Sequence, residues 1–205
     1  LKQIEPRFVG HYSQSPKLIH AYSNGLDTHG LFACDIFGKE SVGELSAVER
    51  FIGKTSWLAT TYGCHYKKLL QTCEINSEER LGLDTTKYLS MWQFLVKDSK
   101  YGDSQRSMRK EYGEKAEEVY SKWMFFQEVQ RNFWKKNPEI WHWTTEQIAR
   151  TRRNGYVETF GGRRIPIAGL DSNNRWERAG AERKCINYQI QPSAGDAFKI
   201  VLKNF

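Results

Sequence analysis

The stretch from residue 46 to residue 63, SAVERFIGKTSWLATTYG, constrains the fold more than any other part of the chain. Ser46 followed three residues later by Glu49 is a capping box, in which each side chain accepts a hydrogen bond from the other residue's free backbone N–H group. Gly63 is the residue type that most often ends a helix, because it adopts the left-handed conformation at low cost. These signals predict one helix from about 46 to 62.

Four side chains follow one another at intervals of four residues along this helix: Arg50, Lys54, Leu58 and Tyr62. At about 100° and 1.5 Å per residue they drift only about 120° around the axis over about 18 Å, so they share one face. The two cations can hold an anion while the other two side chains offer apolar and aromatic surface, which is the polarity of a nucleoside triphosphate. An ordinary amphipathic helix has the same spacing, so the pattern alone leaves both interpretations open.

The charge balance favours an acidic partner. The 205 residues include 31 Lys and Arg against 24 Asp and Glu, which gives a net charge of +7 and a pI of about 9.2. Such a balance favours a polyanion, most simply nucleic acid. The four cysteines show no C-x-x-C pairing and no histidine at zinc-finger spacing, which argues against a structural zinc site and a disulfide framework.

Hydropathy excludes a membrane protein. No apolar run approaches the ~20 residues that a membrane helix needs, and the amino terminus shows no signal-peptide pattern. We therefore expect an intracellular chain in a reducing compartment. Because it does not begin with methionine and its last helical stretch lacks a cap signal, we expect it to be part of a longer protein.

Helix signals dominate the rest of the chain, and residues 156–167 alternate around Gly161 and Gly162, which favours a β-hairpin. Before the helix at 46–62 we expect an extended or helical start at 3–13 and helices at 15–25 and 27–38. Between 74 and 154 we expect two or three helices, the longest at 107–136 and another at 138–153. After the hairpin we expect helices at 174–189 and from about 192 onward. Pro192 is acceptable in the first turn of that last helix. The expected fold class is α+β, predominantly helical.

Four blocks of the sequence, in order, resemble DNA polymerase family A, the group related to bacterial polymerase I. The family pattern Arg, three residues, Lys, three residues, an aromatic residue, three residues, Tyr-Gly is met except at Leu58. Residues 3–38 resemble the stretch after the first catalytic aspartate, with its Gln-Ile-Glu core and its Asp-x-His. Residues 155–167 are similar to the Gly-Tyr-Val-Glu-Thr hairpin, and residues 182–200 to the helix that carries Arg, Asn and Gln toward the DNA duplex.

The resemblance implies a right-hand polymerase, with the fingers and part of the palm. Its expected boundaries are a partial palm at 1–28, fingers at 29–154, and a hairpin with more of the palm at 155–205. The distance from Gly63 to Gly155 exceeds the usual family spacing by a few tens of residues, which implies an inserted helical segment at about 74–125. That insert is either peripheral structure or a clamp for DNA or a replication partner.

The resemblance also implies a site for an incoming dNTP. Arg50 and Lys54 would contact the triphosphate with help from His29, and Lys54 would be the general acid that protonates the leaving pyrophosphate. Glu5 would occupy the space that a ribose 2′-hydroxyl needs. On the sugar and base side, Leu58 replaces the usual Phe or Tyr and so weakens packing.

The resemblance also implies which residues would contact primer-template DNA. Tyr62 would stack near the templating base and hydrogen bond to Glu5, and Gly63 would let the chain turn there. Arg183, Asn187 and Gln191 lie four apart on one helix face, where they would reach the minor-groove edge of the duplex. Arg163 and neighbouring arginines would add phosphate contacts.

Two Mg²⁺ ions are expected in the parent polymerase, but the family's metal-binding carboxylates would lie before Leu1 and beyond Phe205, so the chain alone should not extend a primer.

Two alternatives to a DNA polymerase remain. One is a non-catalytic DNA-binding relic that serves as a replication scaffold, and the other is a single-subunit RNA polymerase, which Glu5 disfavours. Leucine at 58 suggests a phage-encoded member. The expected location is the cytoplasm of a bacterial or phage-infected cell; other replication partners are not indicated.

Overall fold

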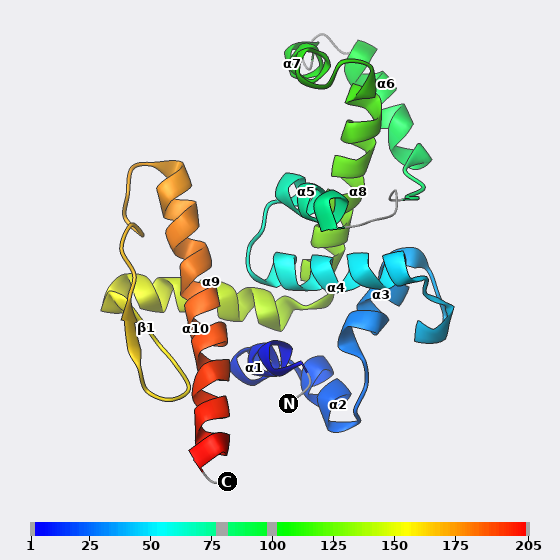
Figure 1. Cartoon of the computed structure of the whole chain (residues 1–205). Helices are drawn as coiled ribbons and strands as arrows, with labels where there is room; N and C mark the ends of the chain where they lie inside the picture. Colours follow the sequence, from blue (N-terminus) through cyan, green and yellow to red (C-terminus); the bar gives the residue numbers. More distant parts are fainter. Residues whose placement is uncertain (1–2, 77–81, 98–101, 204–205) are drawn as a thin grey trace.

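The computed structural model describes residues 3–76, 82–97 and 102–203, and it is mostly helical with one small sheet (Figure 1). The α-helices are α1 (Ile4–Ser13), α2 (Pro16–Ser23), α3 (Thr28–Phe37), α4 (Ala47–Thr61), α5 (Tyr66–Asn76), α6 (Leu89–Lys97), α7 (Gly102–Tyr112), α8 (Ala116–Lys136), α9 (Pro138–Asn154) and α10 (Arg175–Lys203). Short 3₁₀ turns lie at Val42–Glu44, Thr86–Tyr88 and Gly113–Lys115. The expected class, predominantly helical α+β, is confirmed.

Helix α4 has the ends that its sequence predicts. The Ser46 hydroxyl accepts a hydrogen bond from the Glu49 N–H, and the Glu49 carboxylate accepts one from the Ser46 N–H at 2.8 Å. Gly63 follows the helix with φ 73°, a left-handed conformation that glycine adopts without a Cβ clash. The helix that carries the polar stripe is therefore fixed by local signals at both ends.

Helices α3 and α4 pack unusually close to each other. A Cβ atom built on Gly53 would lie 2.8 Å from the Cα atom of Ala33, so only glycine fits at this crossing. On the same side of α4, Trp57 is 3% exposed and meets the His29 ring edge-on with centroids 5.4 Å apart. This packing attaches the start of α3 to the middle of α4.

The main core joins α1, α2 and α3 with α4, α8, α9 and α10. Phe133 is fully buried at its centre and meets Phe32 and Trp57 edge-on, with centroids 5.4 and 6.0 Å apart. A second core lies between α4, α5 and α8 around Ile52 and Phe126, both fully buried. The two cores share α4 and α8, which cross each other in Figure 1.

The predicted break between two carboxy-terminal helices is wrong, because α10 is continuous and holds Pro192 inside it. Proline removes one helical hydrogen bond, and a tertiary contact to Phe160 of the hairpin segment holds the next residue, Ser193, in place. The Ser193 hydroxyl accepts a hydrogen bond from the Phe160 N–H at 2.8 Å and donates to the Gln189 carbonyl, and Ser193 is fully buried. Packing of the helix face therefore overrides the local proline signal.

The predicted long helix at 107–136 is also wrong. Gly113 has φ 56°, which ends α7, and the chain passes through a 3₁₀ turn before α8 begins at Ala116. Helices α6 and α7 pack against the end of α8 that lies farthest from α1 (Figure 1). Within the expected insert at about 74–125, the described residues form the end of α5, two 3₁₀ turns, α6, α7 and the first part of α8, and residues 82–85 have no regular structure.

The predicted hairpin is present, with β1 (Tyr156–Glu158) antiparallel to β2 (Arg164–Pro166) and Val157 opposite Ile165. Asp196 of α10 ties it down: its carboxylate accepts a hydrogen bond from the Thr159 hydroxyl at 2.6 Å and pairs with Arg163 at 2.7 Å. The hairpin is therefore held against the same helix that carries the predicted DNA-facing residues.

Replacing Phe133 by Ala should lower the free energy of unfolding by about 3–5 kcal/mol, because it empties a fully buried aromatic site. Urea denaturation followed by circular dichroism measures this. Phe198→Ala is the matched control, since Phe198 is 55% exposed and its loss should cost less than about 0.5 kcal/mol. Equal losses for the two variants would contradict the core described above.

Candidate functional site

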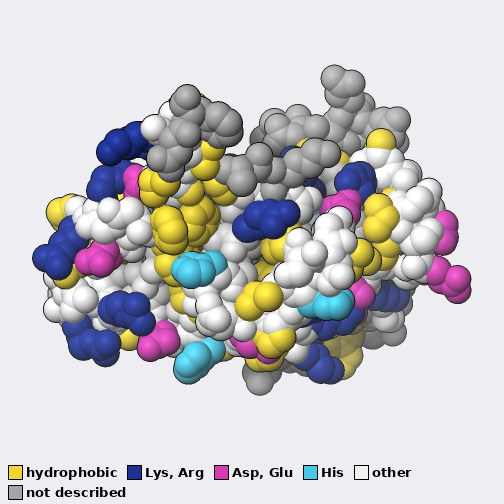
Figure 2. All heavy atoms as spheres, turned by 90° about the horizontal axis from the view of Figure 1, so that it is seen from below, with side chains coloured by type: hydrophobic (Ala, Val, Ile, Leu, Met, Phe, Trp, Pro, Cys, Tyr) yellow, Lys and Arg dark blue, Asp and Glu magenta, His cyan; other side chains and the backbone are white. Residues whose placement is uncertain are grey.

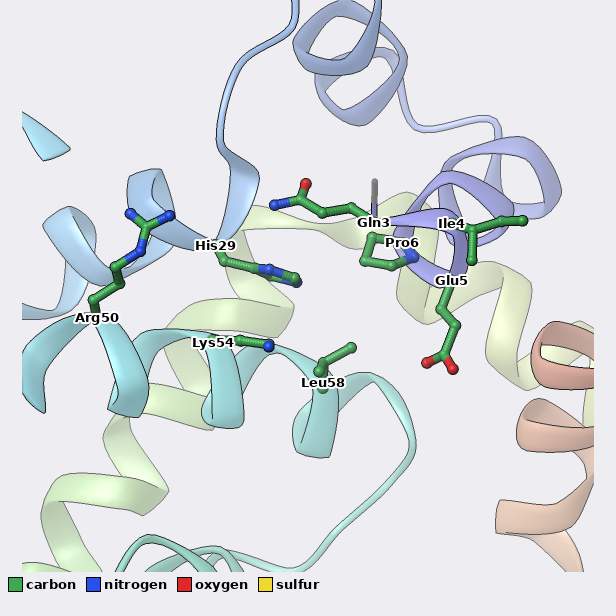
Figure 3. Close-up of a pocket in the computed structure, with 8 residues that line it drawn as sticks. All are labelled: Gln3, Ile4, Glu5, Pro6, His29, Arg50, Lys54 and Leu58. Atoms are coloured by element: carbon green, nitrogen blue, oxygen red, sulfur yellow. The ribbon is translucent and has the colours of Figure 1, made fainter. Parts of the chain in front are cut away.

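One open cavity of about 440 Å³ lies between α1, α3 and α4 (Figure 3). Its lining residues are Gln3, Ile4, Glu5, Pro6, His29, Arg50, Lys54 and Leu58. Five of the predicted site residues therefore converge on one space, although they come from three separate parts of the chain. Cationic side chains lie toward one end of this cavity, and Leu58 with Glu5 lies toward the other (Figure 3).

His29 lines this cavity and has one buried ring nitrogen without a partner among the described residues. The residue is 6% exposed, and its Nε2 atom has no hydrogen-bond partner among the described residues. Burial lowers the pKa of His29 below its ordinary value, and the nearby cations Lys54 and Arg50 lower it further, against the opposing effect of Asp27. A buried polar atom without a partner costs about 1–3 kcal/mol, so this imidazole is poised to gain from a ligand that supplies one.

Lys54 and Arg50 differ in how they are held. The Lys54 side chain extends along the cavity toward α1, beside the imidazole of His29 (Figure 3). Arg50 instead forms an ion pair with Asp27, the residue that caps α3 by accepting a hydrogen bond from the Gly30 N–H at 3.1 Å. The ion pair between Asp27 and Arg50 was not predicted from the sequence, because it depends on how α3 crosses α4.

Glu5 is tied to the end of α4. The Tyr62 hydroxyl donates a hydrogen bond of 2.6 Å to the Glu5 carboxylate, as the sequence predicted. Burial raises the pKa of Tyr62, and the adjacent carboxylate raises it further, so the phenol stays protonated and can donate. This bond holds the Glu5 carboxylate beside Leu58. Tyr62 itself lies outside the lining of the cavity and packs against the main core.

The predicted DNA-facing residues lie on α10, next to the end of α4. A Cβ atom built on Gly63 would meet the Arg183 side chain at 3.3 Å, so the turn and α10 are in close contact. The Asn187 Oδ1 atom is buried without a partner among the described residues. Arg183 and Gln191 are exposed, so three polar side chains of one helix face retain hydrogen-bonding capacity.

Arg163 has a structural partner. Its guanidinium pairs with Asp196 and donates a hydrogen bond of 3.2 Å to the Pro192 carbonyl, although its side chain remains 51% exposed. Its contact with DNA stays a prediction. More broadly, Lys and Arg side chains lie at several separate places on the face seen in Figure 2, with a band of hydrophobic side chains between them.

Two other features, a metal site and a membrane-spanning helix, are absent from the described residues. No group of three or more His, Cys, Asp or Glu side chains there is placed to hold a metal ion. None of the described helices combines the length and the apolar character that crossing a membrane requires. We therefore assign no chemical step to a metal held by these residues. The cavity itself can hold a polyanion at its cationic end and an uncharged group beside Leu58.

Comparisons with known proteins agree with the sequence blocks. The sequence model of the family described as DNA polymerase family A matches residues 1–95 and 99–205. The chain is 27% identical to DNA polymerase I of Treponema pallidum over 200 residues, 98% of this chain and 15% of that protein. It is 28% identical to DNA polymerase I of Mycobacterium tuberculosis strain H37Rv over 200 residues, 98% of this chain and 17% of that protein.

A solved structure shares the fold. The polymerase domain of Pol1 from M. smegmatis, in a complex with DNA primer-template and dNTP, matches with a TM-score of 0.63 at 24% identity, over 97% of this chain and 27% of that one. DNA polymerase theta of Mus musculus is 40% identical over 63 residues, 31% of this chain and 2% of that protein. The chain thus spans less than a fifth of the bacterial relatives named above.

Binding of inorganic tripolyphosphate should raise the pKa of His29, since an anion at Nε2 stabilises the protonated ring. Affinity should therefore increase as pH falls from 7.5 to 5.5, and His29→Gln should lose that extra increase. Calorimetric titration measures the affinity of both proteins at each pH. Tripolyphosphate itself takes up protons equally in both experiments, so the difference between the two affinities reports on His29. His65→Gln is the control: burial also lowers the pKa of His65, which lies outside the cavity lining. The same pH response in wild type and His29→Gln would contradict the assignment.

Proposed function

The chain belongs to DNA polymerase family A, and from that premise we propose that it forms the site for the incoming nucleotide in a template-directed DNA polymerase. In that reaction the primer 3′-hydroxyl attacks the α-phosphate of a dNTP and pyrophosphate leaves. The observation that carries the proposal is the convergence of Glu5, His29, Arg50 and Lys54 on one cavity. The chain spans less than a fifth of its bacterial relatives, so we propose the activity for a polypeptide that contains this chain and not for the chain by itself.

The cationic end of the cavity binds the triphosphate in this proposal. His29 offers a buried nitrogen that lacks a partner among the described residues, and Lys54 extends its ammonium group into the same space (Figure 3). Lys54 protonates the leaving pyrophosphate, a role that requires a donor within hydrogen-bond reach of the departing oxygen. Arg50 lies one helical turn farther along α4 and meets the outer phosphates.

The other end of the cavity selects the sugar. Glu5 occupies the space that a 2′-hydroxyl would need, and the bond from Tyr62 keeps its carboxylate in place. A ribonucleotide would then bring a hydroxyl against a fixed carboxylate in a confined space, which costs more than the same contact with a mobile side chain. Leu58 gives the sugar and base a smaller contact than an aromatic ring. This arrangement favours DNA over RNA synthesis.

Primer-template DNA is the second partner that we propose. Arg183, Asn187 and Gln191 face the minor groove from α10, where the acceptors are largely alike among base pairs and contacts test pair geometry more than sequence. Gly63 and Tyr62 place the template base at the end of α4, and Arg163 meets the backbone. In this scheme residues 29–154 are the fingers, with the insert at about 74–125, and residues 1–28 and 155–205 belong to the palm.

Family A DNA polymerases generally use divalent metal ions, which polarise the reacting phosphate and activate the attacking hydroxyl. The described residues do not fit a two-metal centre, because no group of three donors is present among them. We therefore place two Mg²⁺ ions in other parts of the polymerase and derive no step through them. The cytoplasm of a bacterial or phage-infected cell is the location proposed for the whole protein.

Lys54→Ala in the full-length polymerase should slow single-nucleotide incorporation by about 100-fold or more, because general acid catalysis contributes about 10²–10⁴. Affinity for primer-template should change by less than about threefold, since Lys54 contacts the dNTP and not the DNA in this proposal. Rapid-quench kinetics and fluorescence anisotropy measure the two quantities. Lys136→Ala is the control: Lys136 pairs with Asp35 outside the cavity.

Equal losses of rate and DNA affinity would contradict the acid role of Lys54. A full-length wild-type protein that binds primer-template but never extends it would instead favour the alternative, a non-catalytic DNA-binding relic.

A further inference from the structure

Asp27 lies just outside the cavity and controls one of its cations. Its carboxylate accepts hydrogen bonds from the Gly30 N–H at 3.1 Å and from the Gln3 amide at 3.2 Å, and it pairs with the Arg50 guanidinium. Burial opposes its ionisation, but the bonds from Gly30, Arg50 and Gln3 outweigh that effect and hold the pKa of Asp27 below its ordinary value. Asp27 is therefore a fixed negative charge that joins the starts of α1 and α3 to α4.

The ion pair draws Arg50 to one side. Figure 3 shows the Arg50 guanidinium turned toward the start of α3, whereas the His29 ring and the Lys54 ammonium group extend along the cavity toward α1. The Asp27 side chain is 25% exposed and the Arg50 side chain 50% exposed, so the pair is accessible to a ligand that enters the cavity. An arriving anion must share Arg50 with Asp27 or displace it.

We propose that Asp27 competes with the bound phosphate chain for Arg50 and so sets how much negative charge a ligand needs to occupy the cavity. This inference rests on the proposed function. Arg50 lies one turn, about 6 Å along the axis, beyond Lys54. A short phosphate held by His29 and Lys54 leaves the Asp27–Arg50 pair intact, whereas the outermost phosphate of a triphosphate reaches Arg50 and exchanges one charge-assisted bond for another.

The competition makes the cavity selective. Weakly charged ligands meet a site in which one of three nitrogen-bearing side chains is already neutralised. A triphosphate gains all three, and its departure returns Arg50 to Asp27. Within Asp27, the charge and not the capping bond sets the selectivity, because asparagine at this position would cap α3 equally well and keep an acceptor for the Gly30 N–H.

The test is calorimetric titration of inorganic tripolyphosphate into the 205-residue chain at pH 7.5, fixed ionic strength and without divalent metal. The proteins compared are wild type, D27N, R50Q, D27N/R50Q, K54Q and the control D35N. Asp35 is a second carboxylate of α3 that pairs with a cation, Lys136 at 2.9 Å, outside the cavity. Circular dichroism establishes that each variant keeps the helical content of the wild type.

D27N should tighten tripolyphosphate binding about tenfold, equivalent to about 1.4 kcal/mol. When Arg50 is already replaced by Gln, D27N should change the affinity for tripolyphosphate by about twofold or less. In that background D27N removes only the through-space repulsion between the Asp27 carboxylate and the phosphates. D35N should also stay within about twofold. For orthophosphate, which does not reach Arg50, the gain from D27N should be correspondingly small.

Unchanged or weaker binding by D27N would overturn the inference, and so would an equal gain in both backgrounds or an equal gain from D35N. If wild type binds tripolyphosphate and K54Q binds it less well while D27N shows no gain, the inference fails and the proposed function stands. If neither the wild type nor D27N binds tripolyphosphate better than K54Q, both fail. Should a variant lose its helical content, the same comparison is made as the KM for dNTP in the full-length polymerase.

Discussion

The contact between Gly53 and Ala33 is the constraint on which the cavity depends. Because α4 carries no side chain at this crossing, α3 packs directly on its backbone, and a Cβ atom there would meet Ala33. The start of α3 is thereby held near the cationic half of α4: His29 lies against Trp57, and Asp27 reaches Arg50. The hydrogen bond from Tyr62 to Glu5 then attaches α1 to the other end of α4, on the second side of the cavity.

Local signals in the sequence predicted the elements that depend on local chemistry. The capping box at Ser46, the turn at Gly63 and the hairpin after Gly155 are all present. The signals failed where tertiary packing overrides them. Pro192 lies within α10, where the next residue, Ser193, is buried and accepts a hydrogen bond from the Phe160 N–H group of the hairpin segment. Gly113 interrupts a stretch whose polar and apolar spacing otherwise favours one long helix.

The candidate site, like the fold, was predicted in part from the sequence. Resemblance to the family placed Glu5, His29 and Lys54 in one site, and the structure brings them to one cavity. The bond between Glu5 and Tyr62 was predicted as well. Neither the Asp27–Arg50 pair nor the Asp196–Arg163 pair was predicted, because each joins elements whose crossing the sequence does not specify. Both pairs occupy arginines that the sequence analysis had expected to be free for phosphate.

A crystal structure of the polypeptide with a bound dNTP would show directly whether this cavity holds the nucleotide. We expect density for the triphosphate against His29 Nε2 and Lys54 Nζ, the sugar beside Glu5 and Leu58, and an Arg50 guanidinium that has turned from Asp27 toward the outermost phosphate. A triphosphate bound away from His29 and Lys54, or a sugar that lies far from Glu5, would contradict this expectation.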